Sequence, residues 1–241
     1  MKSRRPFRFK QFEVAQEGGC MPVTTDACIF GAIADIGKAK SALDIGTGTG
    51  LLSLMLAQRF PEAHFTAVDI DEASVNQAHL NFENSPWKDR LNAVKADIRE
   101  WEQGKQFDAI VCNPPFFENQ LPSESEDKRR ARHTVTLDFE TLLQKINTLL
   151  NMDGKCWLLL PFLHAQYIEN IARINALYII HKINILSYVE SQPHVSIFCI
   201  SKNNTGSFYS DFIIYNGKGI YSNSMNAIMK YFYLDLIADN K

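Results

Sequence analysis

Residues 44–50 read Asp-Ile-Gly-Thr-Gly-Thr-Gly, a glycine-rich segment that points to the architecture of the whole chain. They follow a short apolar run at Ser41–Ile45 that is typical of a strand, and they precede an amphipathic stretch at Leu51–Arg59 that predicts a helix. Glycines at alternate positions let the backbone turn sharply and approach a ligand that a Cβ would push away. The pattern differs from the GxGxxG of dinucleotide sites. We interpret it as a strand–turn–helix unit that holds a ligand, with a glycine-rich turn without a ligand as the alternative.

Short apolar runs alternate with helical patterns on both sides of this turn. The expected strands are Ser41–Ile45, His64–Ile70, Leu91–Ala96, Phe107–Cys112, Lys155–Leu160, Ile179–Ser187 and Ser196–Ile200. The expected helices between them are Leu51–Arg59, Glu72–Glu83 and Phe139–Leu150. This alternation predicts an α/β fold with a mainly parallel sheet and helices on both faces. Because only a short link joins the last two strands, we expect them to form an antiparallel hairpin at the sheet edge.

Two flanks lie outside this alternation. The first predicts a short strand in the alternating segment Phe7–Phe12 and a helix at about Thr25–Ile36, and the second a strand at Phe208–Tyr215 and a helix at about Asn223–Ile237. We therefore expect a single globular domain. Its expected parts are an N-terminal segment over the site (1–40), a core (41–202) and a C-terminal extension (203–241).

Composition narrows the class of protein. The chain has 241 residues and a formal net charge of −2, so any contact with nucleic acid must come from a local basic patch. Its five cysteines form no CxxC pair and no metal spacing, which predicts no metal site. The longest apolar run, Cys156–Leu163, is too short to span a bilayer, and the basic N-terminus lacks the apolar stretch of a signal peptide. We expect a cytoplasmic protein with no membrane partner.

Two aspartates at strand ends extend the ligand hypothesis. Asp69 ends the second strand about 20 residues after the glycine turn. In dinucleotide-binding sheets, an acid at this place accepts hydrogen bonds from the ribose hydroxyls. A strand end without a ligand is the alternative for Asp69, and Asp71 is interpreted as the N-cap of the next helix. Asp97 ends the third strand, where a carboxylate could accept from an adenine amino group.

As a set, these residues resemble the class I methyltransferases that use S-adenosylmethionine, over roughly residues 41–161. The resemblance implies a Rossmann-like, seven-stranded, mainly parallel sheet with its last strand antiparallel. It also implies S-adenosylmethionine as the cofactor. Asp44 would hold the methionine ammonium, Asp69 the ribose and Asp97 the adenine. The turn glycines would pack near the methionine and ribose: Gly46, Gly48 and Gly50.

Residues 113–116, Asn-Pro-Pro-Phe, follow the fourth strand. They resemble the signature of methyltransferases that act on amino groups attached to planar π systems, namely adenine N6, guanine N2 and the glutamine amide. The Asn113 side-chain oxygen and the Pro114 carbonyl would accept hydrogen bonds from the amine, which makes its nitrogen more pyramidal and more reactive. Phe116 would stack on the acceptor plane. A rigid exit turn is the alternative, because prolines cannot continue a strand ladder.

A basic loop beside this signature favours a nucleic-acid acceptor. A solvated charge run is the alternative. Phe117 adds a second ring, and the N-terminal segment interleaves cations with aromatics, although a strand packing on the domain is the favoured interpretation there. The candidate RNA-binding residues are Phe117, Lys128, Arg129, Arg130 and Arg132.

Almost end to end, the chain resembles the bacterial enzymes that methylate N6 of adenine 37, next to the anticodon of valine tRNA. The resemblance implies a tRNA anticodon loop as the partner, and it places Thr25, with its neighbours Thr24 and Asp26, near the methionine and the acceptor. One departure is Phe116, where a tyrosine is more usual. The alternatives are a glutamine N5-methyltransferase acting on a translation factor and an RNA-binding module with a vestigial cofactor pocket. We expect a monomer.

Overall fold

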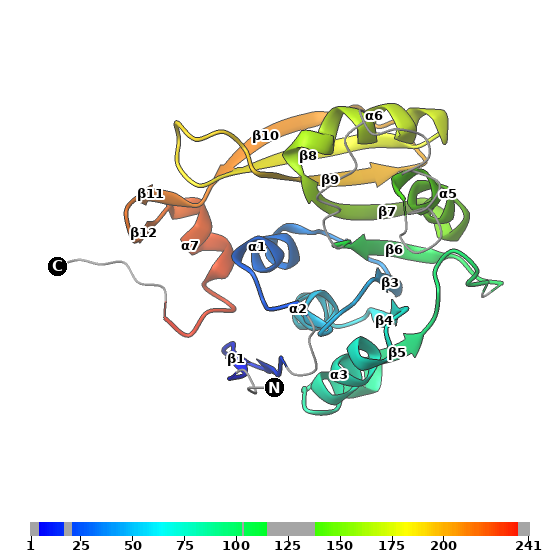
Figure 1. Cartoon of the computed structure of the whole chain (residues 1–241), viewed down its shortest axis with the longest axis horizontal. Coiled ribbons are helices and arrows are strands. Elements are labelled where there is room, and N and C mark those ends of the chain that lie inside the picture. Colours follow the sequence, from blue (N-terminus) through cyan, green and yellow to red (C-terminus); the bar gives the residue numbers. More distant parts are fainter. Residues whose placement is uncertain (1–4, 17–20, 103, 115–137, 236–241) are drawn as a thin grey trace, which may run out of the picture.

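The computed structural model describes residues 5–16, 21–102, 104–114 and 138–235. One eight-stranded sheet forms the centre of the protein, with strand order β10-β8-β9-β7-β6-β3-β4-β5 (Figure 1). Its strands are β3 (Ser41–Ile45), β4 (His64–Asp69), β5 (Leu91–Lys95), β6 (Phe107–Cys112), β7 (Leu150–Pro161), β8 (Tyr178–Leu186), β9 (Val195–Ser201) and β10 (Phe208–Ile213). The predicted α/β fold with a mainly parallel sheet is confirmed.

The part of the sheet beyond β7, formed by β9, β8 and β10, differs from the expectation in one respect. β9 runs antiparallel to both β7 and β8, as predicted for the last two core strands. However, β10 pairs in parallel with β8 from Phe208 to Ile213. The hairpin of β8 and β9 therefore lies inside the sheet, and the C-terminal region supplies the edge strand. The eighth strand forms because β8 would otherwise leave its backbone groups unpaired.

Helices cover both faces of the sheet (Figure 1). One face carries α1 (Thr25–Ile33), α2 (Leu51–Arg59), α3 (Glu72–Glu83) and α7 (Asn223–Met229), and the other carries α5 (Phe139–Leu149) and α6 (Ala165–Ile174). Side chains alternate between the two cores along each strand, so Ala42 packs with the first group of helices and Leu43 with the second. The long apolar runs of the sequence follow from burial on both faces.

Most predicted ends agree with the structure to within a few residues. The helices α2 and α3 and the strands β3 and β6 have the predicted bounds. Two helices end earlier than expected, α1 at Ile33 and α7 at Met229. The helix α6 was not predicted, although Ile168, Ile171 and Ala172 give it a buried stripe. Two single-turn 3₁₀ segments complete the described helices, at Lys88–Arg90 and Phe162–His164.

The N-terminal aromatic residues belong to the core. The two-residue strands β1 (Phe7–Arg8) and β2 (Glu13–Val14) pair antiparallel, and between them Phe9 and Phe12 are buried and stacked with centroids 4.4 Å apart. The Phe12 ring meets Trp87 at 5.5 Å. The segment packs on the domain as expected, and the burial of these two rings excludes their stacking on RNA bases. The single strand predicted over Phe7–Phe12 is wrong, because the chain turns after Arg8, where the Phe9 N–H donates to the Phe12 carbonyl at 2.8 Å.

Candidate active site

The predicted cofactor and acceptor residues follow neighbouring strands at one edge of the sheet. The carboxyl ends of β3, β4, β5 and β6 meet there because all four strands are parallel. Ile45, the last residue of β3, is in register with Val68 of β4 on one side and Cys112 of β6 on the other. The glycine turn therefore lies between the end of β4 and Asn113, as expected for a ligand crevice in such a sheet.

The three glycines of the turn are needed for two different reasons. Gly46, Gly48 and Gly50 all have positive φ, at 70°, 54° and 81°. A Cβ added at Gly46 or Gly48 would meet nothing within 4 Å, whereas one at Gly50 would lie 2.5 Å from Cε1 of Phe82 on α3. The first two glycines thus border open space that a ligand can approach. Gly50 is required for the packing of α3 against the start of α2.

Asp44 is a buried carboxylate with one oxygen left over. The side chain is 1% exposed, and its Oδ2 accepts hydrogen bonds from Thr47 Oγ1 and Ser53 Oγ, each at 2.8 Å. Its Oδ1 is buried and has no hydrogen-bond partner among the described residues. Burial raises the pKa of Asp44 to about 6. An unpartnered carboxylate oxygen in this position fits a cationic ligand group such as an ammonium.

Asp69 connects β4 to the glycine turn. Its Oδ2 accepts from the Gly48 N–H at 2.9 Å, and its Oδ1 accepts from the Asp71 N–H at 3.0 Å. Each carboxylate oxygen keeps a lone pair, which suits two adjacent ribose hydroxyls. Asp71 caps α3 through the Ser74 N–H at 2.9 Å, as predicted. The two aspartates thus have different tasks despite their proximity.

Asp97 is already engaged in an ion pair that the sequence analysis missed. Its Oδ1 accepts from the Arg99 backbone N–H at 3.0 Å and from Arg99 Nε at 2.9 Å, while Nη2 binds Oδ2. The Arg99 side chain holds the pKa of Asp97 below its usual range. An adenine amino group at this strand end would have to share the carboxylate with Arg99. The feature of the sequence that could have revealed this ion pair is the Asp-x-Arg spacing directly after a strand.

The residues predicted to hold the acceptor directly follow β6. Asn113 directly follows the buried Cys112 and is half-buried, and the next residue, Pro114, is buried. The predicted stacking residue Phe116 lies outside the described residues. The same holds for the predicted RNA-binding residues Phe117, Lys128, Arg129, Arg130 and Arg132.

The N-terminus of α1 is held against the start of β9. Thr24 caps the helix, with Oγ1 accepting from the Ala27 N–H at 3.2 Å, and Thr25 is its half-buried first residue. Asp26 Oδ1 lies 3.0 Å from His194 Nε2, just before β9. β9 starts beside the end of β7, at the same edge of the sheet as Asn113. Sequence reasoning did not single out His194, because the contact joins residues far apart in the chain.

The N-terminal segment reaches the glycine turn through Asn81 of α3. The Asn81 Nδ2 donates to the Thr49 carbonyl at 2.8 Å and to the Ala15 carbonyl at 3.1 Å, and its Oδ1 accepts from the Ala15 N–H at 2.9 Å. This buried amide therefore joins the segment before α1 to the turn. It was also missed, since an asparagine inside a helix carries no motif.

The described residues contain neither a cluster of metal ligands nor a membrane-spanning helix. Within these ranges, no group of three or more His, Cys, Asp or Glu side chains is arranged to hold a metal ion. In the same part of the chain, no helix is long and apolar enough to cross a membrane. The four described cysteines are buried and unpaired: Cys28, Cys112, Cys156 and Cys199.

Comparison with solved structures supports the fold. The chain superposes on a predicted O-methyltransferase from Agrobacterium tumefaciens with a TM-score of 0.68 and 13% identity, covering 86% of this chain and 96% of the other. It also matches a putative RNA methyltransferase from Pyrococcus horikoshii with a TM-score of 0.52 and 18% identity, over 73% and 81% of the two chains. At these identities the likeness shows a methyltransferase fold.

Sequence comparison identifies the family. Residues 30–160 match the methyltransferase small domain family. A tRNA1(Val) (adenine(37)-N6)-methyltransferase of Pedobacter heparinus is 39% identical over 96% of this chain and 99% of its own length. The protein with the same name in Bacteroides thetaiotaomicron is 36% identical over 95% and 98%. With its methyltransferase fold and its full-length similarity to these relatives, the chain belongs to the tRNA1(Val) (adenine(37)-N6)-methyltransferase family.

Proposed function

We propose that this protein transfers a methyl group from S-adenosylmethionine to N6 of adenine 37 in a valine tRNA. The observation that carries the proposal is the unpartnered Oδ1 of Asp44 beside the open glycine turn, one strand away from Asn113. A vestigial cofactor pocket has no need of a buried carboxylate with one unpartnered oxygen, because such an oxygen lowers the stability of the fold. The names of its close relatives point to the same reaction.

The chain supplies a partner for each end of the cofactor. Asp44 would pair with the methionine ammonium through Oδ1, and Asp69 would accept from the ribose hydroxyls while it keeps Gly48 in place. Gly46 and Gly48 leave room for the ligand beside the backbone. Asp97 lies at the end of the neighbouring strand, where it also binds Arg99. It would accept a hydrogen bond from the adenine amino group. When bound, S-adenosylmethionine supplies a methyl group made electrophilic by its sulfonium sulfur.

The acceptor amine is held by the residues after β6. The Asn113 side-chain oxygen and the Pro114 carbonyl would each accept a hydrogen bond from the adenine N6 amino group. These bonds pull the nitrogen out of conjugation with the ring and stabilise the positive charge that develops on it. Phe116 would stack on the flipped-out base. Holding the amine in line with its methyl donor is the main catalytic task of these side chains.

The remaining predicted residues would contact the RNA or cover the cofactor. Phe117 and the cations Lys128, Arg129, Arg130 and Arg132 would contact the anticodon loop and its phosphates, since the overall charge of −2 provides no general attraction. The N-terminal segment, joined to the glycine turn through Asn81, would cover the cofactor. We further propose that the enzyme acts as a monomer in the cytoplasm.

A transfer assay with methyl-tritiated S-adenosylmethionine tests the proposal. Unmodified valine tRNA transcript is the substrate, and nucleoside mass spectrometry should find N6-methyladenosine at position 37. A transcript with guanosine at that position should accept no label. Label in bulk protein and none in tRNA would instead identify a protein acceptor and overturn the proposal.

Two asparagine variants separate chemistry from folding. Asn113→Ala should abolish transfer while S-adenosylhomocysteine still binds with unchanged affinity in calorimetry. Asn92→Ala, at an exposed position on β5, is the matched control and should retain full transfer. Wild-type rates from Asn113→Ala would remove Asn113 from the reaction.

A further inference from the structure

The acceptor edge of the sheet continues past Asn113 to a second group of aromatic side chains. β8 is parallel to β6, because both it and β7 are antiparallel to β9 and β7 is parallel to β6. The residues after Leu186, the last residue of β8, therefore lie at the same edge as the acceptor signature. β7 and β9 separate β6 from β8, which places the two ends roughly 15 Å apart across the sheet.

Three tyrosine rings form a row at this place. Tyr188 follows β8, and its ring centroid is 5.7 Å from that of Tyr215, which begins β11 (Tyr215–Gly217). Tyr215 in turn stacks on Tyr221 of β12 (Ile220–Tyr221), with centroids 5.3 Å apart and planes at 15°. Tyr188 is the outer member and is 42% exposed, and its neighbour Val189 is 69% exposed. We call Tyr188 and Val189 the edge platform.

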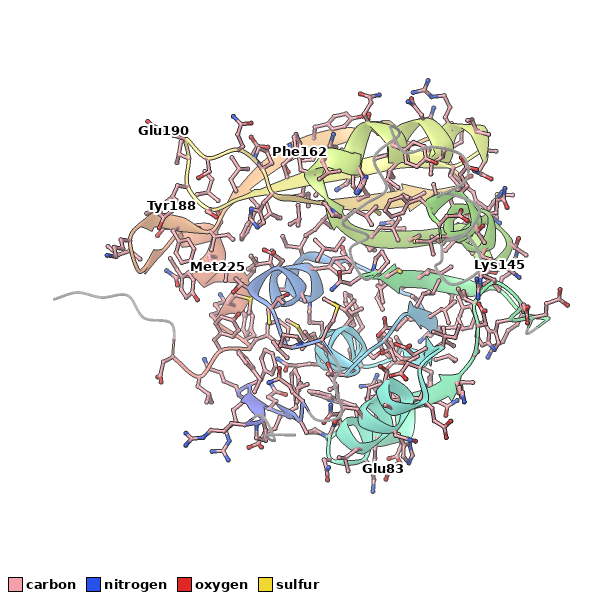
Figure 2. The ribbon with its side chains drawn as sticks, in the orientation of Figure 1. Glu83, Lys145, Phe162, Tyr188, Glu190 and Met225 are labelled. Carbon is pink, nitrogen blue, oxygen red and sulfur yellow. The ribbon has the colours of Figure 1, made fainter. Side chains whose placement is uncertain are left out.

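The platform is held in place although it is exposed. The Tyr188 N–H donates to Ser191 Oγ at 3.1 Å, and the Ser191 N–H donates back to the Tyr188 carbonyl at 3.0 Å. The Tyr215 N–H donates to the Ser187 carbonyl at 2.9 Å, which fixes β11 to the same turn. Figure 2 shows Tyr188 and Glu190 at the left end of the molecule, on the loop between β8 and β9. Such a fixed ring loses little conformational entropy when a second ring stacks on it.

We propose that the edge platform stacks a base of the anticodon loop adjacent to the target adenine. The inference rests on the proposed function, because it requires an RNA loop whose adenine is held at Asn113. Proteins recognise single-stranded RNA loops mainly by stacking splayed bases on aromatic side chains. A base pulled out at Asn113 leaves its neighbours unstacked, and the platform offers them an aromatic surface along the same edge.

The same strand supplies a matched control. Tyr178, the first residue of β8, is 40% exposed, so it resembles Tyr188 in residue type and exposure. However, it lies at the opposite edge of the sheet, beside Ser201 at the end of β9. A general loss of surface aromatic area would affect RNA binding equally in the two alanine variants. A platform at the acceptor edge would affect only Tyr188→Ala.

The test measures binding of an anticodon stem-loop RNA to the full-length protein. Tyr188→Ala should raise the dissociation constant roughly tenfold, while Tyr188→Phe and Tyr178→Ala should bind as the wild type does. Because the platform stacks bases and neutralises no phosphate, the slope of log K against log salt should be the same in all four proteins. Melting temperatures confirm that each variant is folded.

A fluorescent base identifies the contact directly. With 2-aminopurine placed next to the target adenine, on either side in turn, binding to the wild type should quench the fluorescence of one of the two RNAs. Tyr188→Ala should lose that quenching. If Tyr188→Ala keeps the affinity and the quenching while the wild type methylates normally, the proposed role of the platform is wrong and the proposed function stands. A wild type that methylates no valine tRNA would instead overturn the proposed function, and the platform with it.

Discussion

Asp69 Oδ2 accepts a hydrogen bond from the Gly48 N–H at 2.9 Å, so the carboxylate expected to bind ribose also shapes the glycine turn. One side chain thus connects the ends of β4 and β3 at the centre of the proposed cofactor site. Its other oxygen is 3.0 Å from the Asp71 N–H. This double engagement explains why an acid is needed at this strand end, and it makes the effect of removing it predictable.

The first prediction compares Asp69 with its neighbour Asp71. Asp69→Ala should weaken S-adenosylhomocysteine binding by about 100-fold, since it removes the ribose acceptor and a charge-assisted hydrogen bond to the turn. Asp71→Ala should leave binding unchanged but lower the free energy of unfolding by about 1 kcal/mol, because it removes only the cap of α3. Calorimetry and urea unfolding measure the two quantities. Equal loss of affinity in both variants would contradict separate roles.

The second prediction concerns the pH dependence of cofactor binding. Burial raises the pKa of Asp44 to about 6, and a bound ammonium favours the ionised form, so binding must release the proton that Asp44 holds at lower pH. Affinity for S-adenosylhomocysteine should therefore be constant above pH 7 and fall by about tenfold per pH unit well below 6. Asp44→Asn should bind weakly, without this dependence. The exposed-site variant Asp89→Asn should behave as the wild type does.

The same group also affects stability without ligand. The pKa of Asp44 in the folded protein lies above its unfolded value of about 4, so the folded state holds a proton that the unfolded state has released between these values. The contribution of Asp44 to the free energy of unfolding should then decrease as pH rises from about 4 to about 6. The free energy of unfolding, measured by urea at a series of pH values, should change with pH differently in the wild type and in Asp44→Asn across this window. Above it, the two curves of free energy against pH should run parallel.

The third prediction separates the glycines of the turn. Gly50→Ala should lower the free energy of unfolding by roughly 2–4 kcal/mol, because it combines a left-handed backbone with a Cβ that overlaps Phe82. Gly48→Ala should cost only about 1–2 kcal/mol, since its Cβ would enter open space, yet it should abolish cofactor binding.

A double variant checks the contact with Phe82. Phe82→Leu alone should destabilise the protein, but the combination with Gly50→Ala should cost less than the sum of the two single changes, because the smaller side chain vacates the overlapping space. Strict additivity would show that Phe82 is not what excludes a Cβ at this position.

The fourth prediction concerns the ion pair at the end of β5. Arg99 occupies lone pairs of Asp97 that an adenine amino group would use. Arg99→Ala should therefore raise the affinity for S-adenosylhomocysteine by roughly two- to fivefold, whereas Asp97→Ala should lower it. Arg173→Ala, at an exposed position on α6, serves as the control. Weaker binding in Arg99→Ala would mean that Arg99 positions the carboxylate for the cofactor instead of competing with it.

The local elements and their order could be read from the amino-acid sequence. Apolar periodicity placed β3, β6, α2 and α3 at their observed bounds, since burial on both faces of a sheet and on one face of a helix leaves different periods in the chain. The glycine turn and the capping residue Asp71 were also readable, because each acts on a backbone only a few residues away. From these, the fold and the group of strand-end acids followed.

The contact partners of each residue, in contrast, are set by how distant parts of the chain pack together. The sequence could not show that Gly50 faces Phe82, that Asn81 joins the N-terminal segment to the glycine turn, or that β10 pairs with β8. Nor could it show that Asp44 keeps a free oxygen while Asp97 does not. Such contacts depend on side-chain packing and on pairing between distant strands, which carry no periodic signal in the chain.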